Sequence, residues 1–207
     1  MEFALSQQAL QSGASLLNEK LDKVNYNRLK KYFDISNSYL LEKICLLVFP
    51  FNKNEISFGL SIYRPDLYIP IMSFISLVLL KGAVLGFSNK FHPEALIMSF
   101  SRTLLIHIGL NLIYRLASYF FDAPADLLDL ICFTGYKFFI IIIARVLKHI
   151  MFGRFLSLYF FVAYFFFLSR SLKKSFIMEV SQSSKKNIYL LFGIVIFDIA
   201  VALFFSY

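Results

Sequence analysis

Charged residues are scarce in this sequence: Asp, Glu, Lys and Arg together make up 16% of its 207 positions. Soluble proteins carry roughly 25%. Hydrophobic residues reach 58%, including 26 Phe, and the mean hydropathy is +0.67. A soluble domain of this size cannot bury so much apolar surface in its core, because its exterior must stay largely polar. The composition therefore excludes an ordinary soluble domain and indicates an integral membrane protein.

Cysteine is nearly absent, with only Cys45 before the apolar region and Cys132 inside it. This placement argues against a structural disulfide. The sequence also lacks a glycine-rich phosphate loop, a nucleophile elbow and a paired histidine and carboxylate. No cluster of ligands gives His107 a spacing suited to a metal. We therefore expect no cofactor, no metal site and no enzymatic activity.

Five apolar segments match the roughly 20 residues that a bilayer core requires. They are residues 67–87, 95–121, 127–146, 155–171 and 188–205, which together form a predicted transmembrane domain at 67–207. Residues 1–66 are more polar, and residues 1–16 lack the continuous apolar core of a signal peptide. The predicted fold is an all-α integral membrane protein, with five transmembrane helices preceded by a short cytosolic helical N-terminal arm at 1–66.

Within this arm, a short amphipathic helix is expected near residues 36–49. Ser36 or Ser38 caps its start, and Pro50 ends it. Its apolar residues lie near one face, namely Leu40, Ile44, Leu47 and Val48. The helix is too short to span a bilayer. We expect it to lie on the membrane surface or to pack on the bundle.

The orientation follows from the basic residues, which lie mainly at the ends of the apolar segments. This distribution is typical of membrane topology and not of a nucleic-acid-binding patch. With the N-terminus in the cytosol, the cytosolic side holds eight Lys or Arg from residues 1–66 and five from residues 170–186, against four on the opposite side. The positive-inside rule therefore predicts a cytosolic N-terminus and a C-terminus on the other face.

Two ionisable residues lie deep inside predicted spans. Lys137 and Asp198 are each about ten residues from the cytosolic end of their helix, which places both roughly 15 Å deep. The third and fifth helices run in the same direction, so equal depth allows the two side chains to meet. We expect a buried pair that fixes the packing of these helices, and a proton or substrate relay is the alternative.

The second predicted span carries polar residues at every fourth position: His107, Asn111 and Arg115. This spacing places them on one face of a helix. An interhelical hydrogen-bonding face is the favoured interpretation, and the lining of a cavity is the alternative.

Six stretches of the sequence form recognisable motifs: Tyr32–Leu40, Leu46–Phe51, Pro65–Met72, Phe91–Glu94, Gly135–Lys137 and Arg170–Leu172. In order and spacing they resemble the Yip-interacting factor family. The resemblance implies a five-helix protein of the endoplasmic reticulum and Golgi membranes, with a cytosolic N-terminus and a luminal C-terminus. It also implies pairing with a Yip-type five-helix membrane protein and association with Rab-type small GTPases. We expect the cytosolic surface of the arm and of residues 170–186 to face a GTPase or a vesicle coat component. The arm and the stretch between Phe51 and Pro65 are shorter than is usual for the family, and Asp198 has no counterpart in its pattern.

The resemblance also points to a cytosolic platform for a trafficking partner. Its residues are Tyr32, Phe33, Tyr39, Phe49, Pro50, Pro65, Asp66, Tyr68 and Pro70. The alternative is simple anchoring, in which the two later prolines bracket a helix start, Asp66 caps it and Tyr68 is an interfacial aromatic.

The sequence thus favours a non-enzymatic membrane adaptor in vesicle-mediated transport between endoplasmic reticulum and Golgi. A small transporter or channel is one rival, with a polar path along Lys81, His107, Lys137 and Asp198. A bilayer-shaping protein is another, in which the helix near Tyr39–Phe49 wedges one leaflet with Leu40 and Leu47.

Overall fold

The computed structural model describes residues 29–51, 64–121, 126–148, 153–178 and 185–206, and the side chains of all these except 174–178, 185 and 186. The chain divides into two compact units, residues 1–35 and 36–207. In the first unit, residues 29–33 are helical. Most of the predicted N-terminal arm, at residues 1–28 and 52–63, lies outside the described residues.

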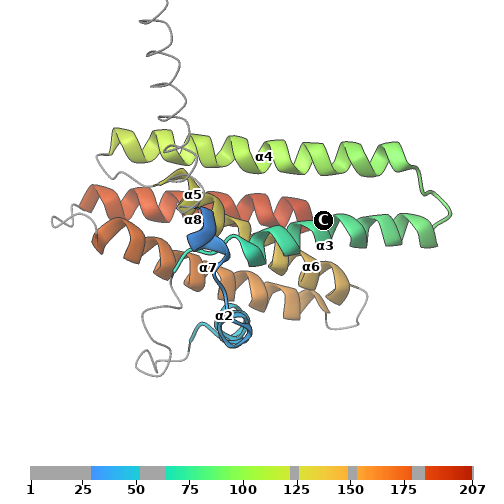
Figure 1. The fold of residues 1–207 in the computed structure, drawn as a ribbon, viewed down its shortest axis with the longest axis horizontal. Coiled ribbons are helices and arrows are strands. Elements are labelled where there is room, and N and C mark those ends of the chain that lie inside the picture. Colours follow the sequence, from blue (N-terminus) through green and yellow to red (C-terminus); the bar gives the residue numbers. More distant parts are fainter. Residues whose placement is uncertain (1–28, 52–63, 122–125, 149–152, 179–184, 207) are drawn as a thin grey trace, which may run out of the picture. The chain divides into compact units, whose positions relative to one another are not determined.

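In the described part of the second unit, all regular secondary structure is helical and there is no strand. Its elements are α2 (Asn37–Val48), α3 (Tyr68–Phe87), α4 (Pro93–Phe120), α5 (Leu127–Gly135), α6 (Lys137–Leu147), α7 (Gly153–Met178) and α8 (Lys185–Ser206) (Figure 1). Among the described residues, five segments are long and apolar enough to cross a membrane, with α5 and α6 forming one of them. The predicted all-α membrane fold with five spans is therefore confirmed, and the ends of the spans lie within two residues of the predicted ones.

Helix α2 is too short to span, and it packs on the bundle. The Tyr39 amide donates to Ser36 Oγ at 3.3 Å, so Ser36 caps its start, and the helix ends two residues before Pro50. Leu46 and Leu47 are buried in the core, and the Tyr159 hydroxyl of α7 donates to the Val48 carbonyl at 3.0 Å. Figure 1 shows α2 almost end-on, so its axis crosses those of the long helices. Of the two positions expected for this helix, on the membrane surface or packed on the bundle, the structure shows the second.

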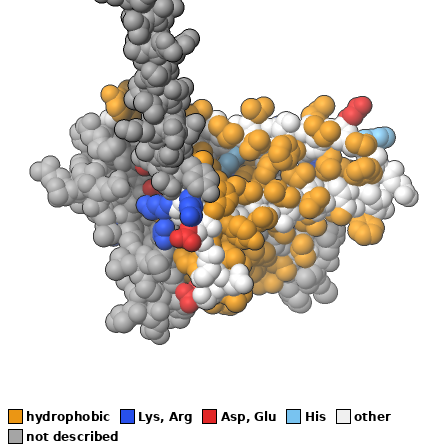
Figure 2. All heavy atoms as spheres, viewed as in Figure 1, with side chains coloured by type: hydrophobic (Ala, Val, Ile, Leu, Met, Phe, Trp, Pro, Cys, Tyr) orange, Lys and Arg blue, Asp and Glu red, His pale blue; other side chains and the backbone are white. Residues whose placement is uncertain are grey.

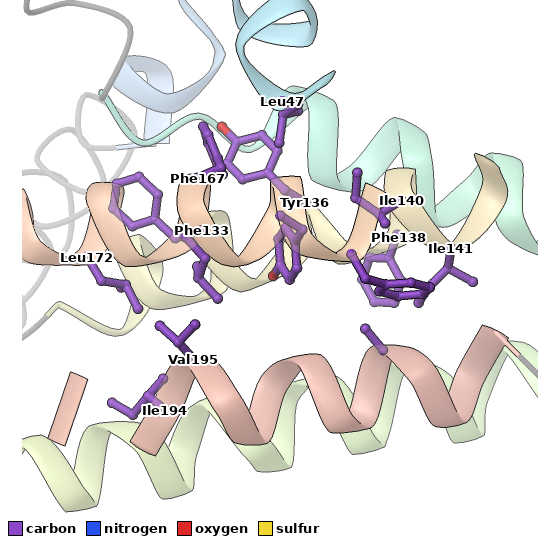
Figure 3. Packing of buried hydrophobic residues seen from close by; sticks show 14 of the residues in the cluster. Leu47, Phe133, Tyr136, Phe138, Ile140, Ile141, Phe167, Leu172, Ile194 and Val195 are labelled. Carbon is purple, nitrogen blue, oxygen red and sulfur yellow. The ribbon is translucent and has the colours of Figure 1, made fainter. Parts of the chain in front are cut away.

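The third span lies at the centre of the bundle. Helix α6 contacts α3, α7 and α8, and this span is the most buried of the five. Leu47 of α2, Phe133 of α5, Ile140 of α6 and Phe167 of α7 belong to one core cluster (Figure 3). Helix α6 packs on α3, α7 and α8, and its Phe138 ring also meets the His107 ring of α4, so the polar groups of α6 lie where several helices meet.

One correction concerns the same span, which the sequence predicted as a continuous helix. The structure interrupts it at Tyr136, between α5 and α6. The Phe139 amide bonds the Tyr136 carbonyl at 3.1 Å, which is the tighter i to i+3 pattern. Next to the interruption, Gly135 packs on Pro70: a Cβ added to this glycine would lie 2.6 Å from the Pro70 Cβ. The close approach of α5 to the first turn of α3 therefore requires glycine.

This contact gives a testable prediction. Gly135→Ala is expected to lower the free energy of unfolding by about 1–3 kcal/mol, because the new methyl group overlaps a rigid ring. Gly193→Ala in α8 is the matched control, since a Cβ there meets nothing within 4 Å. Denaturation of both variants in mild detergent tests the expectation. Equal stability of the two variants would show that α3 and α5 separate at little cost.

Helix α4 is the least buried span and presents a long apolar face, with Leu105 70% exposed and Leu116 61% exposed. On the face shown in Figure 2, hydrophobic side chains are spread along the described part of the bundle, while most of the charged side chains gather at one place. An apolar exterior of this kind suits contact with lipid or with other membrane helices.

Candidate functional site

Two buried ion pairs organise the second unit, and each joins a lysine, an aspartate and two tyrosines. The Asp66 cluster consists of Tyr39, Lys43, Asp66 and Tyr136. The Asp198 cluster consists of Tyr114, Lys137, Tyr164 and Asp198. All four charged side chains are 4% exposed or less, so each charge depends on its partners within the protein.

The Asp66 cluster lies where α2, the start of α3 and the third span meet. Lys43 Nζ lies 3.0 Å from Asp66 Oδ2 and also donates to the Tyr39 hydroxyl at 2.8 Å and to the Arg64 carbonyl at 2.6 Å. The Tyr136 hydroxyl donates to Asp66 Oδ2. The other oxygen, Oδ1, accepts from the Ile69 amide at 3.3 Å. One carboxylate thus caps α3 and ties α2 and the third span to it.

Burial and the Asp66 charge set the protonation of this cluster. Burial raises the pKa of the Tyr39 phenol, and the negative charge of Asp66 raises it further. Burial lowers the pKa of the Lys43 ammonium, while Asp66 opposes that shift. Tyr39 therefore stays neutral and acts as a hydrogen-bond donor at physiological pH. Such a cluster is suited to holding helices together.

The Asp198 cluster lies in the middle of the bundle. Lys137 Nζ donates to Asp198 Oδ1 at 2.7 Å, and the Tyr114 hydroxyl approaches the same oxygen at 3.4 Å. The Tyr164 hydroxyl donates to Oδ2 at 2.8 Å and to the Thr134 carbonyl at 3.2 Å. Side chains from three helices (α4, α6 and α7) therefore bind the single carboxylate of α8, and a carbonyl of α5 accepts from Tyr164.

Polar residues of α4 and α5 extend from this cluster. Thr134 Oγ1 donates to Asn111 Oδ1 at 2.9 Å, and Asn111 Nδ2 donates to the His107 carbonyl at 2.8 Å. The His107 ring meets the edge of Phe138, with ring centroids 4.9 Å apart. Asn111 is fully buried and His107 is 6% exposed, so both face the interior of the bundle.

The structure thus brings together the four residues for which the sequence suggested packing roles: Lys137 and Asp198 form an ion pair, and His107 and Asn111 face the same interior. Arg115, the third member of the predicted stripe, is exposed. Lys81 lies elsewhere: it donates to Ser99 Oγ and lines a separate cleft with Arg145 and Lys148.

The predicted platform residues divide into three groups. Pro50, Asp66 and Pro70 are buried within the second unit, while Tyr39 and Pro65 are partly buried. Phe49 and Tyr68 are exposed, at 58% and 37%. Tyr32 and Phe33 belong to the first unit. In this structure, the accessible part of the proposed platform in the second unit is therefore the pair Phe49 and Tyr68.

Sequence reasoning missed Lys43 and the tyrosines that complete the clusters. The signal for Lys43 was present: it shares the apolar face of α2 with Leu40 and Leu47 at helical spacing, where a lysine needs a buried partner. Nothing local distinguishes Tyr114 or Tyr164 from the other aromatic residues of the chain, because their partner lies 84 or 34 residues away in the sequence.

Within the described part of the chain, no group of three His, Cys, Asp or Glu could hold a metal ion. In both clusters the carboxylate is paired with a lysine and receives tyrosine hydroxyls. These contacts are suited to fixing helix positions.

Comparison with known proteins identifies the family. The family model described as YIF1 matches residues 1–206, which is nearly the whole chain. The chain belongs to the YIF1 family. The resemblance to Yip-interacting factors noted in the sequence is thereby confirmed.

Curated relatives of this YIF1-family chain come from fungi and vertebrates. It is 30% identical to "Protein transport protein yif1" of Schizosaccharomyces pombe, over 94% of this chain and 77% of that protein. It is 33% identical to "Protein YIF1B" of Danio rerio, over 84% of this chain and 62% of that protein. It is 28% identical to "Protein transport protein YIF1" of Saccharomyces cerevisiae, over 84% of this chain and 65% of that protein. The chain thus spans less than two thirds of the length of the Danio rerio and Saccharomyces cerevisiae proteins. No solved structure matches it.

Proposed function

We propose that this protein is a non-enzymatic membrane adaptor in protein transport between the endoplasmic reticulum and the Golgi. The observation that carries the proposal is family membership over nearly the whole chain, together with relatives named as protein transport proteins in two yeasts. The N-terminus faces the cytosol and the C-terminus the lumen, in accord with the excess of basic residues at 1–66 and 170–186.

In this proposal the bundle pairs with a Yip-type five-helix protein through its lipid-facing helices, and its cytosolic end meets a Rab-type GTPase or a vesicle coat component. The exposed apolar face of α4 supports the first contact, because it leaves room for another helix. The exposed Phe49 and Tyr68 support the second, since exposed aromatic side chains are common anchors of interfaces.

The two rival functions have less support. A polar transport path would need Lys81 to join the other ionisable residues, yet Lys81 donates to Ser99 Oγ and lines a separate cleft with Arg145 and Lys148. A leaflet wedge would need Leu47 on the outer face of α2, but this side chain is completely buried.

Affinity recovery from membranes in gentle detergent tests the proposal. The intact chain is expected to recover a second multi-span protein in near-equal amount, together with a small GTPase. Phe49→Ser combined with Tyr68→Ser is expected to reduce GTPase recovery about tenfold, the effect of losing an aromatic anchor, and to leave the membrane partner in place.

The matched control is Phe155→Ser, which removes a 78% exposed aromatic at the start of α7. It is expected to recover the GTPase as the unaltered chain does. If the intact chain recovers no second multi-span protein, the proposed adaptor function is wrong. If the control loses the GTPase as fully as the double variant, Phe49 and Tyr68 are not the contact.

A further inference from the structure

Two basic side chains of the spans line one cleft, where the ends of α3, α6 and α8 come together. Its volume is about 440 Å³, which falls in the range of small-molecule sites. Lys81 lines it from α3, Arg145 from α6 and Ser206 from α8. Lys148 lines it as well and has an interaction of its own. Lys81 and Arg145 are therefore two cations of different helices that share one cavity.

Both cations lie near the end of their helix, within reach of the bilayer surface. Lys81 lies six residues before the end of α3 at Phe87, and Arg145 lies two residues before the end of α6 at Leu147. At 1.5 Å per residue, these positions are roughly 9 Å and 3 Å from the helix ends. A group at the level where the lipid head groups begin can therefore contact both side chains.

The hydrogen-bond partners of the two cations are uncharged. Lys81 Nζ donates to Ser99 Oγ of α4, and Arg145 Nη2 donates to the Phe205 carbonyl of α8 at 2.7 Å. Lysine offers three N–H donors and arginine five, so each side chain keeps donors that these bonds do not use. No acidic residue is among the described residues that line the cleft.

The charges around Lys81 are unbalanced. Arg145 and Arg102 of α4 both act on it as like charges. The C-terminal end of α8, where Phe205 accepts from Arg145, supplies roughly half a negative charge as a helix terminus. That is too little to balance two full charges whose side chains are half-buried in spanning helices. An anionic ligand with strong hydrogen-bond acceptors would complete the site.

The other walls of the cleft are mostly apolar. Leu80, Val84 and Leu85 line it from α3, and Val146 lines it from α6. Val84 is 49% exposed and Val146 is 52% exposed, so the cleft opens on the outer, apolar side of the bundle. A lipid therefore reaches the cleft from the bilayer directly, and its hydrocarbon part finds apolar side chains there.

We propose that this cleft binds an anionic phospholipid. The phosphate accepts hydrogen bonds from Lys81 and Arg145, and an acyl chain lies along Val84 and Val146. Guanidinium and ammonium groups both bind phosphate oxygens well, and basic residues near a membrane surface attract anionic lipid. The cleft lies at the end of α3 opposite to Tyr68. Failure of this site would therefore leave the proposed adaptor function untouched.

The absence of tryptophan from the chain provides a direct test. Val84→Trp places one fluorophore in the cleft of the full-length protein, reconstituted in phosphatidylcholine vesicles. A minor fraction of phosphatidylserine with brominated acyl chains is expected to quench it about tenfold more effectively than the same fraction of brominated phosphatidylcholine, a factor that corresponds to about 1.4 kcal/mol. Adding Lys81→Gln and Arg145→Gln is expected to make the two lipids quench equally.

The matched control is Lys90→Gln with Arg154→Gln. It removes the same charge from the same end of the bundle, at two residues that do not line the cleft. The control is expected to keep the preference for phosphatidylserine. Equal loss of the preference in the two double variants would overturn the proposal, because it would indicate diffuse attraction between the protein and the bilayer.

Two further variants keep the test decisive if one protein fails to fold. Val146→Trp serves as the second reporter, and Lys81→Gln alone, which leaves the bond from Arg145 to α8 intact, is expected to reduce the preference to about threefold. Equal quenching of the reporter by the two lipids in the otherwise unaltered chain would overturn the proposal. So would loss of the preference on adding inorganic phosphate, which would identify a free anion as the ligand.

Discussion

Replacing Asp198 alone by Leu is expected to destabilise the protein by about 3–5 kcal/mol, whereas replacing Asp198 by Leu and Lys137 by Met together is expected to cost far less. The single change leaves a buried ammonium without its counter-charge, at a point where the ion pair is 2.7 Å long and both side chains are at most 1% exposed. A buried pair is costly to break and often neutral to replace by apolar residues of similar size. SDS titration in mixed micelles measures the free energy of unfolding of each variant.

Two further variants show whether charge is the cause. Lys137→Met is expected to cost less than Asp198→Leu, because the remaining carboxylate still accepts from Tyr164 at 2.8 Å. Asp198→Asn keeps the size of the side chain and removes its charge, so it is expected to destabilise almost as much as Asp198→Leu. The double-mutant cycle is expected to give a coupling of about 2 kcal/mol or more. Additive effects of the two single changes would show that the pair does not hold the helices.

The second large effect is expected at Asp66. Asp66→Ala removes the acceptor for Lys43, Tyr136 and the Ile69 amide in one step. It also leaves the buried Lys43 ammonium without a counter-charge. A loss of about 3–5 kcal/mol is expected for breaking a buried pair of this kind. Hydrogen exchange adds a local measurement: the amides of α2 are expected to lose protection, while those in the middle of α4 keep theirs.

Glu42→Ala is the matched control for this experiment. Glu42 is an exposed carboxylate on α2, one residue before Lys43. Its removal is expected to change stability by no more than about 0.5 kcal/mol, as is usual for surface substitutions. If Asp66→Ala left the exchange of α2 unchanged, the cluster would not be what holds this helix on the bundle.

Hydropathy and spacing were sufficient to predict the spans of this protein. Each apolar run matches the bilayer thickness, and Pro50 and Ser36 mark helix ends through local chemistry alone. Equal depth of Lys137 and Asp198 in helices of the same direction was also sufficient to suggest that they meet. The spans and helix ends depend on short stretches of chain, and the pair follows from counting residues along two predicted spans, which is why the sequence alone predicts both.

The Asp66 cluster and the interruption at Tyr136 depend on contacts between distant segments. Tyr136 lies 70 residues from Asp66, and Gly135 meets Pro70 only after α3 and α5 have packed together. Asp66 and Pro70 looked like candidate partner contacts because they form part of a recognisable motif. Their burial gives them an internal role that no local pattern in the sequence distinguishes from an external one.

The order of synthesis gives the Asp198 cluster a further consequence. Lys137 leaves the ribosome 61 residues before Asp198, so the third span enters the bilayer with an unmatched positive charge. On insertion scales that charge costs about 2.5–3.5 kcal/mol at the centre of a helix, and the neighbouring run Phe138–Ile143 offsets it. Only the arrival of the final helix neutralises it. A chain that stops short of Asp198 therefore keeps the Lys137 ammonium without its counter-charge within the membrane.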